Sequence, residues 1–126
     1  MIVGIVAVGG REATVDLTVQ GRADAQRVVR AVIDTGFNGW LTMPPDLVRE
    51  LALVQRGEER AVLADGSQVS VGVHQATVMW DGRALRLPVH STGGAPLIGM
   101  ALLRGYEVFV QVVDGGAVRI TALGTG

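Results

Sequence analysis

The sequence predicts a single all-β domain with one or two short helices, and three observations support this fold class. Several segments alternate apolar and polar residues with a period of two, which is the pattern of half-buried strands. Turn-forming pairs, either two glycines or aspartate followed by glycine, separate those segments. The 126 residues, 48% of them apolar and 18% charged, suffice for one compact core and not for two. We therefore expect one domain spanning residues 1–126.

The first third of the chain is predicted to form three strands. Clean alternation marks ATVDLTVQG, and Gly9 and Gly10 separate it from the apolar opening segment MIVGIVAV. Residues 2–20 are therefore expected to form a hairpin. The next segment, RVVRAVI, has apolar residues on both faces, which is typical of a strand in the middle of a packed structure. It runs directly into Asp34.

A helix and a hairpin are predicted for the middle of the chain. The segment PPDLVRELAL begins with proline and aspartate and then carries apolar residues at helical spacing. AVLADGSQVSV is typical of a hairpin, with Asp65 and Gly66 at a tip that tolerates positive φ values. Charged residues between these two segments, Glu58 and Glu59, are expected to lie in a solvated loop.

The C-terminal half is predicted to continue as strands. Between residues 69 and 80 the alternation changes phase, and we expect a β-bulge near His74 or Gln75 as the cause. Asp81 and Gly82 turn the chain into the strand RALRLPVH. APLIGMALLRGY then predicts a buried segment and a short helix, and EVFVQVV with AVRITAL predicts a last hairpin around residues 114–116.

Composition excludes several classes of function. A net charge of −1 and a pI near 6.1 argue against nucleic-acid and membrane-surface partners. All eleven basic residues are arginine, and we expect no three of them to cluster as a phosphate site would require. The absence of cysteine excludes disulfides, thiolate zinc sites and cysteine nucleophiles. The opening apolar segment has no basic residues and is too short to span a bilayer, so we expect a cytoplasmic protein.

Asp34 is the main candidate for a functional residue, because it directly follows a strand that is expected to be buried. A carboxylate at the end of a buried strand costs free energy unless hydrogen-bond donors face it. The following residues can supply them, namely the Thr35 hydroxyl and the backbone N–H groups around Gly36. Two such carboxyl groups held together share one proton, so that one acts as base and the other as acid. The alternative is a purely structural role, in which Asp34 is a turn residue at the end of a strand.

The remaining polar and aromatic candidates have simpler interpretations. His74 and His90 have no carboxylate or cysteine at ligand spacing, so we expect ordinary surface or edge histidines, no metal site and no cofactor. Trp40 and Trp80 are expected in the core or at a dimer contact.

The segment VIDTGFNGWLTMP, followed by PLIGMALL with Gly99 65 residues after Asp34, resembles the retropepsin-like (clan AA) aspartic proteases. The resemblance covers essentially the whole chain and is nearest to the prokaryotic branch, in which phenylalanine follows Asp-Thr-Gly. It implies a closed β-barrel-like lobe and an aspartic endopeptidase that is active as a homodimer. The sequence agrees with dimerisation, because it contains one Asp-Thr-Gly and a second carboxylate must come from another copy.

The resemblance also implies roles for individual residues. Asp34 and its twin would activate a water for attack on a peptide bond, Thr35 would hydrogen-bond across the dimer axis, and Gly36 would leave room for substrate. Gly99 would support the loop from behind. Substrate would contact Phe37 and a flap formed by Ala64, Asp65, Gly66 and Ser67.

Two hypotheses follow from the resemblance. The first is the homodimeric endopeptidase acting on an extended peptide. The second is a catalytically silent dimeric module of the same fold that binds a peptide or protein, and Phe37 favours it because better-characterised relatives carry a small residue there. In either case the termini, residues 1–8 and 117–123, would interleave with those of the partner in one sheet.

Overall fold

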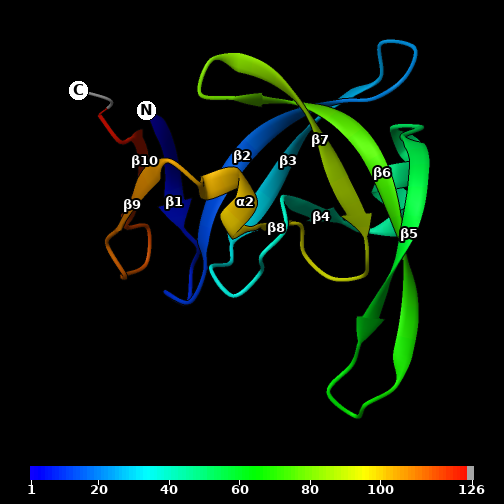
Figure 1. Cartoon of the computed structure of the whole chain (residues 1–126). Coiled ribbons are helices and arrows are strands. Elements are labelled where there is room, and N and C mark those ends of the chain that lie inside the picture. The colour runs from blue at the N-terminus through cyan, green and yellow to red at the C-terminus, as the bar shows by residue number, and fades with distance from the viewer. Residues whose placement is uncertain (125–126) are drawn as a thin grey trace.

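The computed structural model describes residues 1–124, which form ten strands and two short helices (Figure 1). The all-β class with two short helices is therefore confirmed. The elements are β1 (Ile2–Val6), β2 (Ala13–Gln20), β3 (Gln26–Ile33), β4 (Leu41–Met43), α1 (Pro45–Glu50), β5 (Val54–Val62), β6 (Gln68–Trp80), β7 (Arg83–Ser91), β8 (Leu97–Ile98), α2 (Met100–Leu103), β9 (Tyr106–Val110) and β10 (Ala117–Ala122).

Six of the strands close into a barrel. The strands follow one another in the order β5-β6-β7-β4-β8-β3-β2-β1-β10-β9, and β2 also pairs with β6. This second pairing, Val19 with Val78 and Gln20 with Thr77, joins the two ends of the run from β6 to β2. The closed β-barrel-like lobe is thereby confirmed. Outside the barrel, β5 extends one end of the sheet and β1, β10 and β9 extend the other (Figure 1).

The hydrophobic core lies inside the barrel and consists of the apolar residues of the alternating strands. On β2 the side chains of Val15, Leu17 and Val19 point inward and are almost fully buried. On β6 the inward set ends with Trp80, of which 1% is exposed. Trp40, in contrast, is 37% exposed and lies outside this core. Burial of these large side chains, at about 1.5–3 kcal/mol each, provides the main stabilisation of the barrel.

The predicted bulge lies on a different strand from the one expected. Strand β6 pairs with β7 without interruption from Gly72 to Trp80, whereas the β5–β6 register shifts between Gln55 and Gly57. The extra residue is therefore Arg56 of β5, which lies opposite the expected position. The change of phase in β6 has another cause: the first part of this long strand runs out of the barrel with β5, where the core no longer decides which face is apolar.

One further expectation is wrong. Glu58 and Glu59 belong to β5 and not to a loop, because pairing with β6 continues along the whole projecting hairpin. The chain termini pair within one chain, β1 with β10, and this leaves β9 as the edge strand of the sheet. Within one chain the terminal strands therefore lie side by side in the sheet, and their interleaving with the termini of a partner stays a prediction. Within the described residues there is no helix of the length and apolar character needed to span a bilayer.

Candidate active site

Asp34 follows the last residue of β3, in a loop that β8 fixes. Strand β8 runs parallel to β3, with Val32 opposite Leu97 and Ile33 opposite Ile98. The backbone N–H of Asp34 donates to the carbonyl oxygen of Ile98 at 2.9 Å. Backbone hydrogen bonds to β8 therefore hold the end of β3 as far as Asp34, so the Asp34 side chain starts from a defined position.

The loop itself supplies one donor to the carboxyl group. The backbone N–H of Gly36 donates to Oδ1 of Asp34 at 2.9 Å, and the N–H of Phe37 donates to the carbonyl oxygen of Asp34 at 3.1 Å. The expected role of the Gly36 amide is thus confirmed. Thr35 differs from expectation, because its hydroxyl makes no hydrogen bond to the carboxyl group in the described chain. The side chain of Thr35 is exposed and faces a hollow beside Ile33 and Val110.

Gly99 and Gly39 allow the Asp34 loop to lie directly on the start of α2. A Cβ atom on Gly99 would lie 2.1 Å from the carbonyl oxygen of Gly39 and 2.5 Å from the Phe37 ring. The N–H of Gly99 donates to the carbonyl oxygen of Trp40 at 3.0 Å, and the N–H of Met100 donates to that of Phe37 at 2.8 Å. Gly99 therefore supports the loop from behind, as predicted.

The ring of Phe37 packs against its own chain. It covers Gly39, whose Cβ would meet the ring at 2.5 Å, and it covers Gly99. Its edge-to-face neighbour is His90 on β7, with 6.0 Å between the ring centroids. These contacts hold the half-buried ring in a pocket lined by the two glycines and the histidine.

The residues predicted to form a flap lie together at the tip of the β5–β6 hairpin. Oδ1 of Asp65 accepts hydrogen bonds from the hydroxyl of Ser67 at 2.6 Å and from its backbone N–H at 2.9 Å. These bonds lower the pKa of the Asp65 carboxyl group. Gly66 has a φ of +85°, which glycine tolerates. Ala64 completes the exposed tip.

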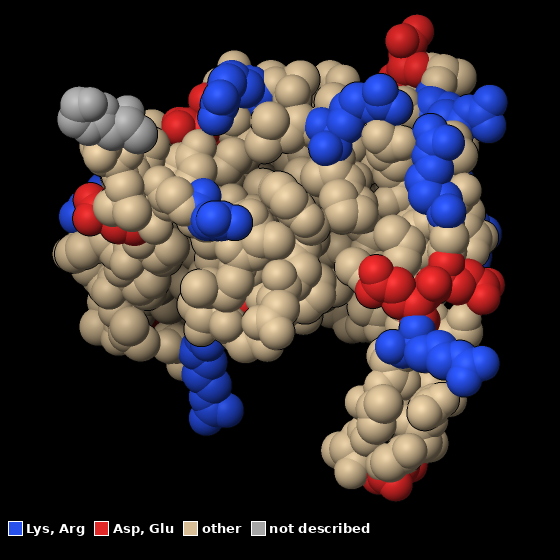
Figure 2. Space-filling view, viewed as in Figure 1, with Lys and Arg blue, Asp and Glu red and all other residues tan. Residues whose placement is uncertain are grey.

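This hairpin is a projecting arm. Figure 1 shows it leaving the barrel beyond β4, and Figure 2 shows open space between the arm and the body of the molecule. Large apolar side chains on the arm are exposed, among them Val62 at 69% and Leu63 at 46%. The structure therefore brings Asp34, Thr35, Gly36 and Phe37 into one loop and keeps the four tip residues on a separate arm.

One contact near the site was missed by the sequence interpretation. Nε2 of His90 lies 2.8 Å from Oε2 of Glu59, so His90 does have a carboxylate partner, contrary to expectation. The two residues are 31 positions apart in the sequence, and the pairing of β5, β6 and β7 side by side in the sheet brings them together. Among residues 1–124 no three His, Cys, Asp or Glu side chains gather as metal ligands would.

Comparison with known proteins identifies the fold. No protein-family model and no curated protein matches the chain. Among solved structures, EIAV protease complexed with the inhibitor HBY-793 has a TM-score of 0.52 at 17% identity, over 75% of this chain and 86% of that one. A retropepsin-like aspartic protease from Rickettsia conorii has a TM-score of 0.52 at 10% identity, over 98% and 92%. The chain therefore has a retropepsin-like fold.

Proposed function

We propose that this chain is an aspartic endopeptidase that acts as a homodimer. The observation that carries the proposal is the Asp34 loop: a carboxyl group at the end of β3, oriented by the Gly36 amide and backed by β8 and Gly99. The retropepsin-like fold that carries this loop also supports the proposal, because the two similar structures are both named as proteases.

The chemistry requires two carboxyl groups. One Asp34 from each copy would face the other across a two-fold axis, and at short range the two would share one proton. The ionised carboxylate takes a proton from a water as its oxygen attacks the peptide carbonyl carbon, while the protonated carboxyl group gives its proton to the carbonyl oxygen. The carboxyl group that took the water proton then gives it to the amide nitrogen, and the C–N bond breaks. One hydroxyl of the tetrahedral intermediate returns its proton to the other carboxylate, so that the amine and the carboxylic acid leave and the dyad again holds one proton.

Surface features next to Asp34 support a dimer. The hollow that Thr35 faces is lined by apolar residues of β9 and the loop that follows it, Val108, Val110 and Val112. Further large apolar side chains are exposed on this extension of the sheet, including Val3, Ile5 and Phe109. Such a patch is typical of a surface that another chain covers. The exposed Thr35 hydroxyl is then available to a second copy.

The projecting arm supports a role in substrate binding. The exposed tip of the arm consists of Ala64, Asp65, Gly66 and Ser67. This tip would close over a bound peptide, to which the exposed apolar side chains of the arm offer an apolar surface. Phe37 would form part of the floor beside the dyad. An extended peptide is the substrate that would fit the open space between the arm and the body of the molecule (Figure 2).

A silent dimeric peptide-binding module of the same fold is the second candidate. The large ring of Phe37 beside the Asp34 loop is the observation that favours it. Against it stands the packing of that ring on Gly39, Gly99 and His90, which gives the ring a place within its own chain.

The test is to incubate the protein and its Asp34→Asn variant with a diverse peptide mixture from acidic to neutral pH and to identify new termini by mass spectrometry. Cleavage should fall by at least about 100-fold in the variant, since removal of a general acid or base costs this much. Specific activity should also rise with protein concentration as dimers form. Binding of peptides by both proteins as dimers, with no cleavage by either, would support the silent module instead.

A further inference from the structure

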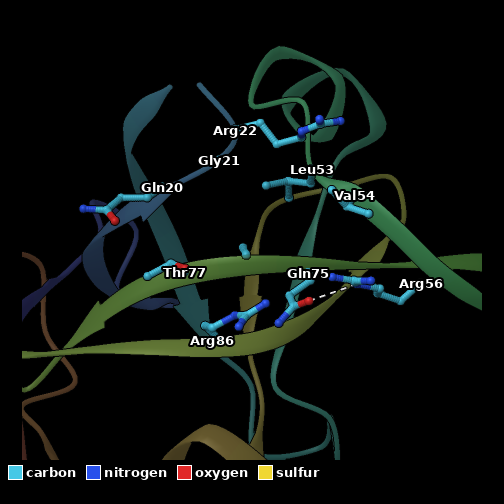
Figure 3. A pocket seen from close by; sticks show the side chains of 10 residues that line it. Gln20, Gly21, Arg22, Leu53, Val54, Arg56, Gln75, Thr77 and Arg86 are labelled. Atoms are coloured by element: carbon cyan, nitrogen blue, oxygen red, sulfur yellow. Dashed lines mark hydrogen bonds between the residues drawn. The ribbon is translucent and has the colours of Figure 1, made fainter. Parts of the chain in front are cut away.

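Three arginines line one cleft on the barrel, contrary to the expectation that no three would cluster. Arg22 follows β2, Arg56 is the bulge residue of β5, and Arg86 lies on β7. The cleft has a volume of about 120 Å³, and Gln75 and Thr77 of β6 contribute its polar floor (Figure 3). The arginines are far apart in sequence, and the β2–β6 pairing that closes the barrel brings them together.

None of the three arginines forms an ion pair with a carboxylate in residues 1–124. Other arginines of the chain do, as the pairs Arg27–Glu50, Arg30–Asp16 and Arg49–Asp46 show. No acidic side chain lines the cleft. The acidic residue nearest to it in sequence is Asp24, two positions after Arg22. In Figure 2 basic side chains gather at the upper right of the molecule, around the end of β2 and the adjoining strands.

A hydrogen bond orients the guanidinium group of Arg56. The bulge releases Arg56 from the regular register, and its Nε donates to Oε1 of Gln75 at 2.9 Å. The two terminal nitrogens of the Arg56 guanidinium group remain available as donors. In Figure 3 the side chains of Arg56 and Arg86 lie on the two sides of Gln75, with Arg22 across the cleft beyond Leu53.

The backbone that carries Arg22 is fixed as well. The N–H of Arg22 donates to the carbonyl oxygen of Leu51 at 3.1 Å, just after α1. A Cβ atom on Gly21 would lie 1.9 Å from that same oxygen, so only glycine permits the approach. The rim of the cleft is therefore a packed turn against the end of α1.

We infer that this cleft binds a small oxyanion with two negative charges, namely a phosphoryl group. The unpaired guanidinium groups of Arg56 and Arg86 flank Gln75 and repel one another (Figure 3). An anion between them removes that repulsion while it accepts paired N–H donors from the two arginine forks. The amide of Gln75 and the hydroxyl of Thr77 add donors of the kind that phosphate oxygens accept. The cleft is smaller than the roughly 300–1,000 Å³ of typical pockets for larger ligands, which suits an isolated phosphoryl group.

This site is separate from Asp34 and goes beyond the proposed peptidase function. Gln20 pairs with Gln26 at the start of β3, whereas Val32 precedes Asp34 at its end. Six residues of extended strand separate those pairs, which corresponds to about 20 Å. Binding in the cleft therefore needs neither a dimer nor an intact dyad.

The test is a titration of the ¹⁵N-labelled full chain with inorganic phosphate, and separately with phenyl phosphate, at constant ionic strength. Saturable shifts of the Arg56 and Arg86 Nε–H signals and of the Gln75 side-chain amide are expected. The double variant Arg56→Gln, Arg86→Gln should weaken binding at least about tenfold, because it removes two charged groups that donate to the anion. Tighter binding of phenyl phosphate would identify a phosphomonoester as the ligand, and tighter binding of inorganic phosphate would identify the free ion.

Arg60→Gln is the matched control, because Arg60 is also an exposed arginine of β5 but donates to Gln68 on the projecting arm. It should bind phosphate within about twofold of the parent. Thermal melting of each variant checks that the fold is kept. Shifts that do not saturate, that chloride reproduces, or that persist unchanged in the double variant would overturn the inference.

Discussion

The ring of Phe37 meets the ring of His90 edge to face, with 6.0 Å between centroids and an interplanar angle of 89°. His90 in turn contacts Glu59 of the projecting arm. A continuous set of contacts therefore runs from the loop that carries Asp34, through Phe37 and His90, to the base of the arm that we propose closes over substrate.

Phe37→Ala should destabilise the protein by about 2–4 kcal/mol, because the half-buried ring fills the space between Gly39, Gly99 and His90. Phe37→Leu, which keeps most of the apolar volume, should cost less than about 1.5 kcal/mol. Urea unfolding of both variants measures the difference. Equal stability of Phe37→Ala and the parent would mean that the ring does not pack on its own chain in solution.

Gly99→Ala should lower the free energy of unfolding by about 1–3 kcal/mol. The added Cβ would lie 2.1 Å from the carbonyl oxygen of Gly39, so the backbone must move. The movement would shift the Asp34 loop, so any peptidase activity should fall as well. Gly93→Ala is the control, because no atom lies within 4 Å of its added Cβ. The free energy of unfolding of Gly93→Ala should lie within about 0.5 kcal/mol of that of the parent. Matching losses in the two variants would contradict the close packing behind the loop.

Glu59→Ala should loosen the arm by removing its contact with His90. Because Glu59 is largely exposed, the expected change is about 0.2–1 kcal/mol, or roughly a 1.5- to 5-fold increase in hydrogen exchange of the β5–β6 amides beyond the barrel. Glu58→Ala is the matched control, since Glu58 accepts a hydrogen bond from Ser70 within the arm itself. If both variants exchange alike, the link from His90 does not restrain the arm.

The ion pair between Asp16 and Arg30 should give a stability term that depends on pH. The hydrogen bond from Arg30 lowers the pKa of the Asp16 carboxyl group in the folded state. A lowered folded-state pKa means that the contribution is present above the unfolded pKa of about 3.9 and disappears as pH falls through the lower folded value.

A double-mutant cycle of Asp16→Asn and Arg30→Gln measures this contribution. The coupling free energy should be small and favourable at pH 7, because both side chains are exposed, and should decrease as the pH falls below the unfolded pKa of about 3.9. A coupling that stays constant across this range would show that the pair does not titrate as inferred.

The sequence by itself determined the features that depend on neighbouring residues. Strands β2 and β7 follow from their period of two, and the turns at Asp65-Gly66 and Asp81-Gly82 follow from residues that tolerate positive φ. The hydrogen bond from the Gly36 amide to Asp34 is equally local, since its partners are two positions apart. Short-range sterics and hydrogen bonding fix such features wherever the segment lies.

Only the tertiary structure decided the features that depend on strand pairing. The bulge at Arg56, the contact of His90 with Glu59 and the packing of Phe37 on Gly99 each join segments distant in sequence. The cleft of Arg22, Arg56 and Arg86 exists because β2 pairs with β6 and closes the barrel. Register between distant strands depends on the packing of the whole core, so no short segment encodes it.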